Sequence, residues 1–565
     1  MPNPLIRALR CAASLWLGLM LLSCGGGREA APGGTSPPTA SSGQVAAVKA
    51  YKVSYYAAAR FADQASFGPT PALIEALRSK GFEQWIDEQL ALPVTPIEEM
   101  KVVLNWNVSQ NDNGMSHNAM RAELMKAFLS APDQLRWRAT WSLSQYFVIS
   151  VIRVEPAALI FWANDLYRLS LGNYAQLIRD VSTSAPMGFY LDNAQNRPKS
   201  AQCPSCAPNE NYARELLQLF TLGVVKLNAD GSTVRDNRGR PVQTYSQRDV
   251  DELARALTGW RYDPVHVPDT PRNWGNWPKR MLPDTNPASR DSGQKLILGR
   301  SFAAGQSHQK DLDDVVAMLM QHPNIAPFVV LRFIQHLVKS DPTPAYIARI
   351  GAVFRGASGG QAGDMKAVIK AVLLDPEARR GDDPSQAFAG DGKLREPMLQ
   401  LAGLLRGLGC TAAPIEPWSN RAMVPAAQDP FMQESVFGFY APTDRAPGSN
   451  LLAPEQKLIN SSVFFDRLWH LNYMVQYNGG AQGRQAIVDA GCRLDEFVGA
   501  YRRSTADLAA LIGTRWLRGL PPADLARVLA DIDKVWRTAS RMTELEIVIK
   551  LIEFALIGAG YGAMT

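Results

Sequence analysis

The sequence is poor in the residues and patterns that usually identify a reaction. Histidine occurs only 6 times in 565 residues, and the histidines are scattered without the spacing of a paired metal site. The chain has no glycine-lysine loop for phosphates, no dinucleotide-binding glycine pattern, no His-Glu-x-x-His and no Gly-x-Ser-x-Gly. These absences exclude the common motif-defined nucleotide-binding proteins, zinc proteases and serine hydrolases. We therefore predict no metal site and assign no cofactor.

Charge of one sign is not in excess either. The chain has 59 basic and 53 acidic residues, for a net charge of +6, and they are spread along its length. A nucleic-acid-binding domain would be expected to gather basic residues in a patch or stripe. We therefore predict no nucleic-acid partner. At 46% hydrophobic and 20% charged residues, the composition is typical of a globular protein.

The apolar run near the N-terminus is too short to cross a bilayer, which takes ~20 residues. It covers residues 11–22, follows Arg7 and Arg10, and ends in Leu-Leu-Ser before Cys24. That ending is similar to the cleavage site of lipoprotein signal peptides, so residues 1–23 are predicted to be such a peptide, with a lipid on Cys24. The several acyl chains of a lipoprotein hold a membrane firmly. The alternative is an ordinary secretory signal cleaved nearby, and both interpretations predict export.

The segment after Cys24 reads as a tether. It is rich in Gly, Pro, Ser and Thr to about residue 42 and has too little apolar surface to order itself. We assign residues 24–50 to the lipidated cysteine and this tether, and 51–565 to one folded body. Gly25 stands where an aspartate would favour inner-membrane retention, so the outer membrane is favoured. The membrane face is left open.

Four cysteines remain in the mature body: Cys203, Cys206, Cys410 and Cys492. An even count in an oxidising compartment favours disulfides. Cys203-Pro-Ser-Cys206 has the spacing of a redox motif but lacks the following histidine that covalent haem attachment needs. A structural disulfide between Cys203 and Cys206 is the favoured interpretation. A tetrahedral thiolate site is the alternative, and the pairing of the other two cysteines is left open.

Apolar residues recur at helical spacing along nearly the whole body, which predicts an all-α fold. Helices are predicted at 173–181, 209–222, 247–258, 311–321, 325–338, 365–374, 397–408 and 544–557. Strand signals are limited to 224–245, where two Xaa-Gly turns predict a minor β-hairpin. Segments 263–292 and 411–454 read as long loops. One large helical body with loop insertions is the expected architecture.

The predicted helix at 209–222 has a conspicuous polar face. Glu210 and Arg214 are i, i+4 neighbours, and Asn211 and Glu215 have the same spacing. Tyr212 and its helical neighbours should be buried on the opposite face. Such a polar face is often only solvated or internally paired. It could also hold an anion through Arg214.

Short blocks in a fixed order give the chain a specific resemblance. It resembles the bacterial family catalogued as domain of unknown function 1800, and the blocks cover most of the mature chain, with the last ~80 residues matching only loosely. The blocks are ASFGPT at 65–70, APDQL at 131–135, LSQ at 143–145, NY at 173–174, PMG at 186–188, PNENYARELLQLFTLG at 208–223, ARALTGW at 254–260, HPN at 322–324, DMKA at 364–367, LDPE at 374–377, KLREP at 393–397, SVFGFY at 435–440 and APE at 453–455.

The resemblance implies an exported, mostly helical protein whose motifs carry no agreed catalytic role. It also implies a neighbouring exported protein similar to sulfatases as a possible partner. Because the polar helix coincides with the family's most recognisable block, we expect ligand binding by Asn209, Glu210, Asn211, Arg214, Glu215, Arg255 and Trp260. Lys393, Arg395 and Glu396 form another charged block, which could simply brace a helix.

Two hypotheses follow. The first is a lipid-anchored envelope protein that binds or assembles with another exported protein or polymer. The alternative is a hydrolase of envelope or extracellular polysaccharide, with Glu210, Glu215 and Asp249 as candidate catalytic carboxylates. A hydrolase would place one of the glutamates in a cleft facing a second acid. Whether the protein is an enzyme is left open by the sequence.

Overall fold

The computed structural model describes residues 51–99, 113–201, 203–264, 277–357, 359–388, 390–416, 419, 421–460, 463, 471, 480–539 and 542–564. The chain divides into two units, Met1–Ala50 and Tyr51–Thr565, and the described residues all belong to the second. The predicted signal peptide, Cys24 and the tether lie outside the described residues.

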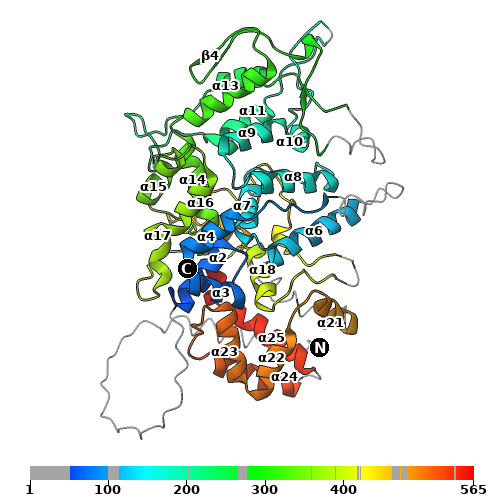
Figure 1. The fold of residues 1–565 in the computed structure, drawn as a ribbon, viewed down its shortest axis with the longest axis vertical. Coiled ribbons are helices and arrows are strands. Elements are labelled where there is room, and N and C mark those ends of the chain that lie inside the picture. Colours follow the sequence, from blue (N-terminus) through cyan, green and yellow to red (C-terminus); the bar gives the residue numbers. More distant parts are fainter. Residues whose placement is uncertain are drawn as a thin grey trace. The chain divides into compact units, whose positions relative to one another are not determined.

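The described part of the body is built mainly from helices (Figure 1), which confirms the predicted all-α class. The helices are α2 (Tyr55–Ala65), α3 (Pro71–Lys80), α4 (Phe82–Ala91), α6 (Asn113–Ser130), α7 (Gln134–Ser144), α8 (Pro156–Leu169), α9 (Tyr174–Thr183), α10 (Ala185–Tyr190), α11 (Asn211–Glu215), the π-helix η1 (Leu216–Thr221), α12 (Gln247–Ala256), α13 (His308–Gln321), α14 (Ile325–Leu337), α15 (Pro344–Phe354), α16 (Met365–Leu374), α17 (Pro376–Arg379), α18 (Pro397–Gly407), α21 (Gly480–Asp489), α22 (Leu494–Arg503), α23 (Thr505–Trp516), α24 (Leu525–Ala539), α25 (Glu544–Leu556) and α26 (Ala559–Gly562). Short strands form antiparallel pairs: β1 (Trp260–Arg261) with β2 (Leu282–Pro283), β3 (Lys295–Ile297) with β4 (Arg300–Phe302), and β5 (Lys393–Leu394) with β6 (Ala563–Met564).

Helix ends follow the capping chemistry of the sequence. The Thr70 side chain accepts from the backbone of Leu73 at the start of α3, whose first residue is Pro71. Ser246 and Asp249 form a reciprocal capping box on α12. Each cap satisfies amide groups that lack a partner inside the helix. The predicted helices accordingly begin and end within a few residues of the observed ones.

The predicted helix at 209–222 departs from its expected geometry. It begins as α11 and continues as the π-helix η1, which ends before Gly223. Gly223 has φ +74°, and a Cβ on it would lie 2.5 Å from the ring of Phe328, so only glycine fits this stop. The wider π turn shifts the side chains, leaving Leu219 half-buried while Phe220 is 2% exposed. A period of 3.6 residues does not foresee this shift.

The segment at 224–245 turns back on itself twice. Its three short legs, at 225–227, 233–235 and 241–243, pair through isolated antiparallel bridges, and none is long enough to be assigned as a strand. The Val234 amide donates to the Lys226 carbonyl oxygen, Val242 donates to Val234, and Lys226 donates to Val242, at 2.8, 3.0 and 2.8 Å. The legs are joined by the predicted turns, where Gly231 and Gly239 both have positive φ. Each of the three legs therefore pairs with the other two, whereas the predicted β-hairpin would have two paired strands.

Helix packing brings the middle of the chain together. Helix α14 packs against α7, α15 and α16, and α11 packs against α12. The C-terminal helices α22 to α25, orange and red in Figure 1, gather on one another. The β5–β6 pair joins Lys393 to Met564. The Lys393 ammonium donates to the carbonyl oxygen of His336 at 3.4 Å, which places α14 beside the segment before α18.

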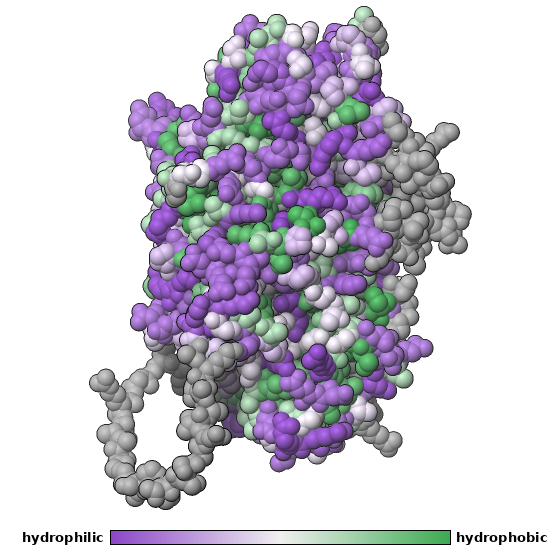
Figure 2. Space-filling view, viewed as in Figure 1, coloured by the Kyte–Doolittle hydropathy of each residue, from purple (hydrophilic) through white to green (hydrophobic). Residues whose placement is uncertain are grey.

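The face shown in Figure 2 is largely hydrophilic, with small scattered hydrophobic groups. Among the described residues, no single helix has the length and apolar character needed to cross a membrane. By length and composition α13 and α14 would pass as a pair, and they are bent by 75° at the break between them.

Candidate functional site

The predicted polar face forms a surface network that satisfies itself. An Arg214 nitrogen lies 2.6 Å from a Glu210 carboxylate oxygen, and the two side chains are 38% and 41% exposed. Gln247 of α12 donates to Glu210 at 2.7 Å and to Asp251 at 2.7 Å, and it accepts from Arg214 at 3.0 Å. Glu210 is therefore held in a partly exposed ion pair.

Glu215 has a different environment. It is 6% exposed, and in the described structure one of its carboxylate oxygens has no hydrogen-bond partner. Burial raises its pKa to about 6, against the opposing charge of Arg214. Its charge also raises the pKa values of Tyr190 and Tyr245, which are raised mainly by burial. This buried acid could exchange a proton near neutral pH.

Among the described residues, only Arg214 contributes a charge effect to the pKa of Glu215, and no second carboxylate contributes one as a catalytic pair would. Asn211, its i, i+4 neighbour, donates instead to Asp192 at 3.3 Å. Asp192 is also ion-paired with Arg153. Asp192 has φ +58°, an uncommon conformation for a residue other than glycine. The structure thus brings Asn211 and Asp192 together, with Glu215 one turn further along the helix.

Asn209 and Trp260 brace the loop that contains Asp192. Asn196 donates to the Asn209 carbonyl oxygen at 3.1 Å and accepts from the Asn209 amide at 2.7 Å. The Gln195 amide donates to the carbonyl oxygen of Trp260 at 2.7 Å. The Trp260 side chain is 2% exposed. These contacts give both residues a structural role.

Asp249 and Arg255 are likewise occupied by partners within the fold. Asp249 caps α12 and accepts from the Leu298 amide at 2.8 Å. Burial alone would raise the pKa of Asp249, but these hydrogen bonds outweigh it and lower it. Arg255 binds Asp291 and Glu252, each at 2.8 Å, and their hydrogen bonds raise its pKa. Asp249 is not brought to face either glutamate.

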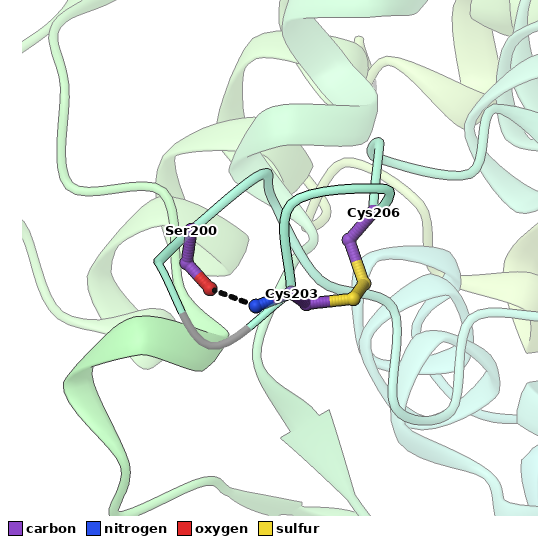
Figure 3. The surroundings of a disulfide bond; sticks show 3 residues. All are labelled: Ser200, Cys203 and Cys206. Carbon is purple, nitrogen blue, oxygen red and sulfur yellow. Dashed lines mark hydrogen bonds between the residues drawn. A yellow bond between two sulfur atoms is a disulfide. The ribbon is translucent and has the colours of Figure 1, made fainter.

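Both pairs of body cysteines are joined in disulfides. Cys203 and Cys206 close a short loop, where the Cys203 amide donates to the Ser200 hydroxyl oxygen at 3.1 Å (Figure 3). Cys410 and Cys492 join segments 82 residues apart in the sequence. Among the described residues, no group of His, Cys, Asp or Glu side chains could hold a metal ion.

A pocket that the sequence did not single out lies between the end of α7, helix α14 and the segment at 436–455. Its empty volume is ≈ 580 Å³, which includes space open to solvent. It is lined by Gln145, Tyr146, Leu219, Arg332, Gln335, His336, Val436, Phe437, Phe439, Tyr440, Ala441, Pro442, Pro454 and Glu455. The lining combines aromatic, apolar and neutral polar side chains with a single arginine and a single carboxylate.

Arg332 of α14 is the cation of this pocket. Its side chain is 7% exposed, lies over the Phe328 ring at 3.4 Å from the centroid, and donates to the Phe328 carbonyl oxygen at 2.8 Å. Burial lowers its pKa to about 10, opposed by the nearby phenols of Tyr146 and Tyr174. Within the described part of the chain, no Asp or Glu forms an ion pair with it. A buried arginine of this kind can attract an anion.

The neighbouring polar groups are neutral or already bonded. Burial lowers the pKa of His336 to about 3, so its ring is neutral at pH 7, and it lies 3.4 Å from the Tyr440 hydroxyl. The Tyr146 hydroxyl is buried without a hydrogen-bond partner in the described structure. Glu455 accepts from the Leu394 amide at 2.8 Å and from Ser340. Glu455 is the one carboxylate among the residues that line the pocket, and it is already hydrogen-bonded.

A buried ionic cluster lies next to the pocket. Lys393 and Glu396 are 2.6 Å apart and almost fully buried. Burial alone would raise the pKa of Glu396, but the charges of Lys393 and Arg138 help to lower it to about 2. Burial raises the pKa of Tyr440 well above its usual value, and the charge of Glu396 raises it further. The charged block at 393–396 thus braces one wall of the pocket.

Some residues of this pocket lie in the sequence blocks that carry the family resemblance. Blocks quoted for the family resemblance supply Gln145, Tyr440 and Glu455, and the adjoining block supplies Glu396. Gln145 lies more than 200 residues before the other three in the sequence, and nothing in the spacing of the blocks shows that they meet. Arg332 and His336 lie on an apolar helix outside any quoted block, so sequence reasoning missed both.

No curated protein and no solved structure matches the chain. The sequence model of the family described as protein of unknown function (DUF1800) matches residues 60–556, which is most of the chain and includes both the polar helix and the pocket. The chain therefore belongs to the DUF1800 family, as its sequence blocks predicted.

Proposed function

We propose that this chain is an exported, lipid-anchored envelope protein that binds another exported molecule, a polymer or a protein, through the pocket beside α14. The observation that carries the proposal is the composition of that pocket. It is open, walled by aromatic side chains, and holds a buried cation together with one carboxylate that is already bonded. Such a lining suits recognition, since hydrolysis of a glycosidic bond ordinarily needs paired carboxylates.

The location is part of the same proposal. The basic start, the short apolar run and Cys24 support lipidation and export, and Gly25 after the cysteine favours the outer membrane. The tether at 24–50 would then carry the helical body at some distance from the bilayer. A sulfatase-like exported protein is the partner implied by the family resemblance.

The alternative, a polysaccharide hydrolase, is favoured by one observation. Glu215 is buried, its pKa is raised to about 6, and one carboxylate oxygen is free of hydrogen bonds in the described structure. A general acid needs such a pKa. The second acid would have to be Asp192, reached through Asn211. We rank this function second because Asp192 is paired with Arg153.

Affinity isolation from detergent-solubilised native membranes tests the first function. Tagged wild type is compared with Phe437→Ala, which removes a 51% exposed aromatic ring from the pocket, and with the Glu210→Ala/Arg214→Ala double variant. We expect a stoichiometric companion or bound glycan that Phe437→Ala loses and the double variant keeps.

Loss of the companion only in the double variant would move the contact to α11 and contradict the pocket. If neither variant alters what is isolated, the pocket plays no part in binding. Polysaccharide cleavage by wild type that is abolished by both Glu215→Gln and Asp192→Asn would establish the alternative.

A further inference from the structure

The pocket beside α14 contains several polar groups whose bonding is incomplete. Arg332 has no ion-pairing carboxylate among the described residues. The Tyr146 hydroxyl and the side-chain oxygen of Gln145 are buried, and neither has a hydrogen-bond partner within the described structure. Buried polar atoms in native proteins are almost always bonded, to protein or to something that enters the site. Together these groups indicate what a ligand must supply.

Arg332 and Tyr146 need a hydrogen-bond acceptor, whereas the side-chain oxygen of Gln145 needs a donor. A guanidinium binds a carboxylate through parallel hydrogen bonds, and a tyrosine hydroxyl can donate to the same anion. The Gln145 amide nitrogen already donates to the Trp141 carbonyl oxygen at 3.2 Å and to the Ser144 hydroxyl at 3.0 Å. Its free oxygen can only accept, so it requires a donor such as a ligand hydroxyl. The complementary ligand presents a carboxylate and a hydroxyl close together.

The pocket is open to solvent, and its empty volume of ≈ 580 Å³ includes part of that open space. A planar guanidinium matches the two oxygens of a carboxylate through parallel hydrogen bonds, and the remainder of a ligand bound there would extend toward the open, outer part of the pocket.

The outer part of the pocket offers an aromatic surface. Phe437 lines it and is 51% exposed, an unusual exposure for a phenylalanine. A flat ring at the entrance can pack against the C–H face of a sugar ring. The one carboxylate of the lining, Glu455, is held by the Leu394 amide and Ser340 and does not pair with Arg332. Arg332 thus retains its charge for a ligand.

We propose that this pocket binds a uronate, a sugar unit carrying a carboxylate, within an exported polymer. The carboxylate lies against Arg332 and Tyr146, a ring hydroxyl donates to Gln145, and the sugar face packs on Phe437. The assignment rests on the proposed binding function and specifies its ligand.

Titration calorimetry on the detergent-purified full-length protein tests the assignment. The probes are sodium glucuronate, glucose and sodium acetate, each at constant ionic strength. We expect glucuronate to bind more tightly than acetate, and glucose to bind weakly or not at all. Arg332→Met should weaken glucuronate binding about 10- to 100-fold, as expected for a lost charge-assisted contact. Tyr146→Phe, which removes only an unbonded hydroxyl and should fold normally, should weaken it about 3- to 10-fold.

The matched control is Arg349→Met, since Arg349 is 47% exposed and already paired with Asp375 at 2.7 Å. It should leave glucuronate affinity unchanged. Equal affinity for acetate and glucuronate would overturn the sugar assignment, and full binding by folded Arg332→Met or Tyr146→Phe would overturn the site. Absence of glucuronate binding, while Phe437→Ala still loses a companion from membranes, would reject the uronate and leave the binding function standing. If glucuronate binds but Phe437→Ala keeps its companion, the uronate assignment stands and binding of the companion through the pocket is rejected.

Discussion

The polar face of α11 and the pocket beside α14 contain similar side chains in opposite states. Arg214 lies on the surface, 2.6 Å from Glu210, and shares a glutamine with it. Arg332 is 7% exposed, and no acid in the described part of the chain pairs with it. An exposed ion pair contributes about 0–1 kcal/mol, whereas an unpaired buried charge is costly. An anionic ligand that binds Arg332 in the pocket would supply the partner that this buried charge lacks among the described residues.

The same contrast extends to the acids. The carboxylates chosen from the sequence are mostly satisfied by near neighbours, as Asp249 is by the α12 cap. Glu215 is the exception, because it is buried with an unbonded oxygen. The comparison teaches that charges at regular spacing on one helix tend to neutralise one another. Unsatisfied groups collect where distant segments meet.

The largest expected effect concerns the buried cluster beside the pocket. Glu396→Gln preserves the shape of the side chain but removes a charge that Lys393 and Arg138 require. Removing one partner of a buried ion pair costs about 3–5 kcal/mol. We expect a marked fall in the urea denaturation midpoint. Glu544→Gln is the matched control, because Glu544 pairs with Arg502 on the surface, where the side chains are 48% and 66% exposed. Equal effects of the two substitutions would show that burial does not separate these classes of ion pair.

A smaller effect is expected from Glu215 and depends on pH. Its pKa is raised from 4.5 to about 6, so folding favours the protonated form. The stabilising contribution is complete below pH 4.5 and is lost as pH rises through 6. The shift of about 1.5 units corresponds to about 2 kcal/mol. Glu215→Gln should therefore gain about 2 kcal/mol relative to wild type between pH 4 and pH 8, measured by urea denaturation at both values. A difference between the proteins that does not change with pH would contradict the buried, unpaired state of this carboxylate.

Local sequence patterns predicted the helices well, because caps and apolar spacing act within a few residues. The cap of Thr70 on α3 and the capping box of Ser246 on α12 each involve residues within three positions of the helix start. The family membership was also predicted. The π-helix after Glu215 was not predicted, and Gly223, which follows it, lies against Phe328, a residue 105 positions away in the chain.

The candidate site was predicted less well, for a related reason. The sequence shows which side chains share a helix face, and Glu210 and Arg214 are indeed neighbours. It does not show burial, and the chemical character of a charge depends on burial more than on spacing. Arg332 reads in the sequence as an ordinary interruption of an apolar helix. Only the fold reveals that it faces Tyr146 and a pocket without an acidic partner among the described residues.

The smallest effect is expected at the surface pair, where it tests the other half of the comparison. A double-mutant cycle on Glu210→Ala and Arg214→Ala measures their coupling free energy directly. Because both side chains are more than a third exposed, the coupling should be about 0–1 kcal/mol and should shrink further in 0.5 M salt. The single variants should each change the denaturation midpoint little. A coupling of about 2 kcal/mol or more, insensitive to salt, would mean that this network is shielded from water as the pocket is. The polar face of α11 would then again be a candidate binding site, because a charge pair shielded from water on an exposed helix implies a partner that covers it.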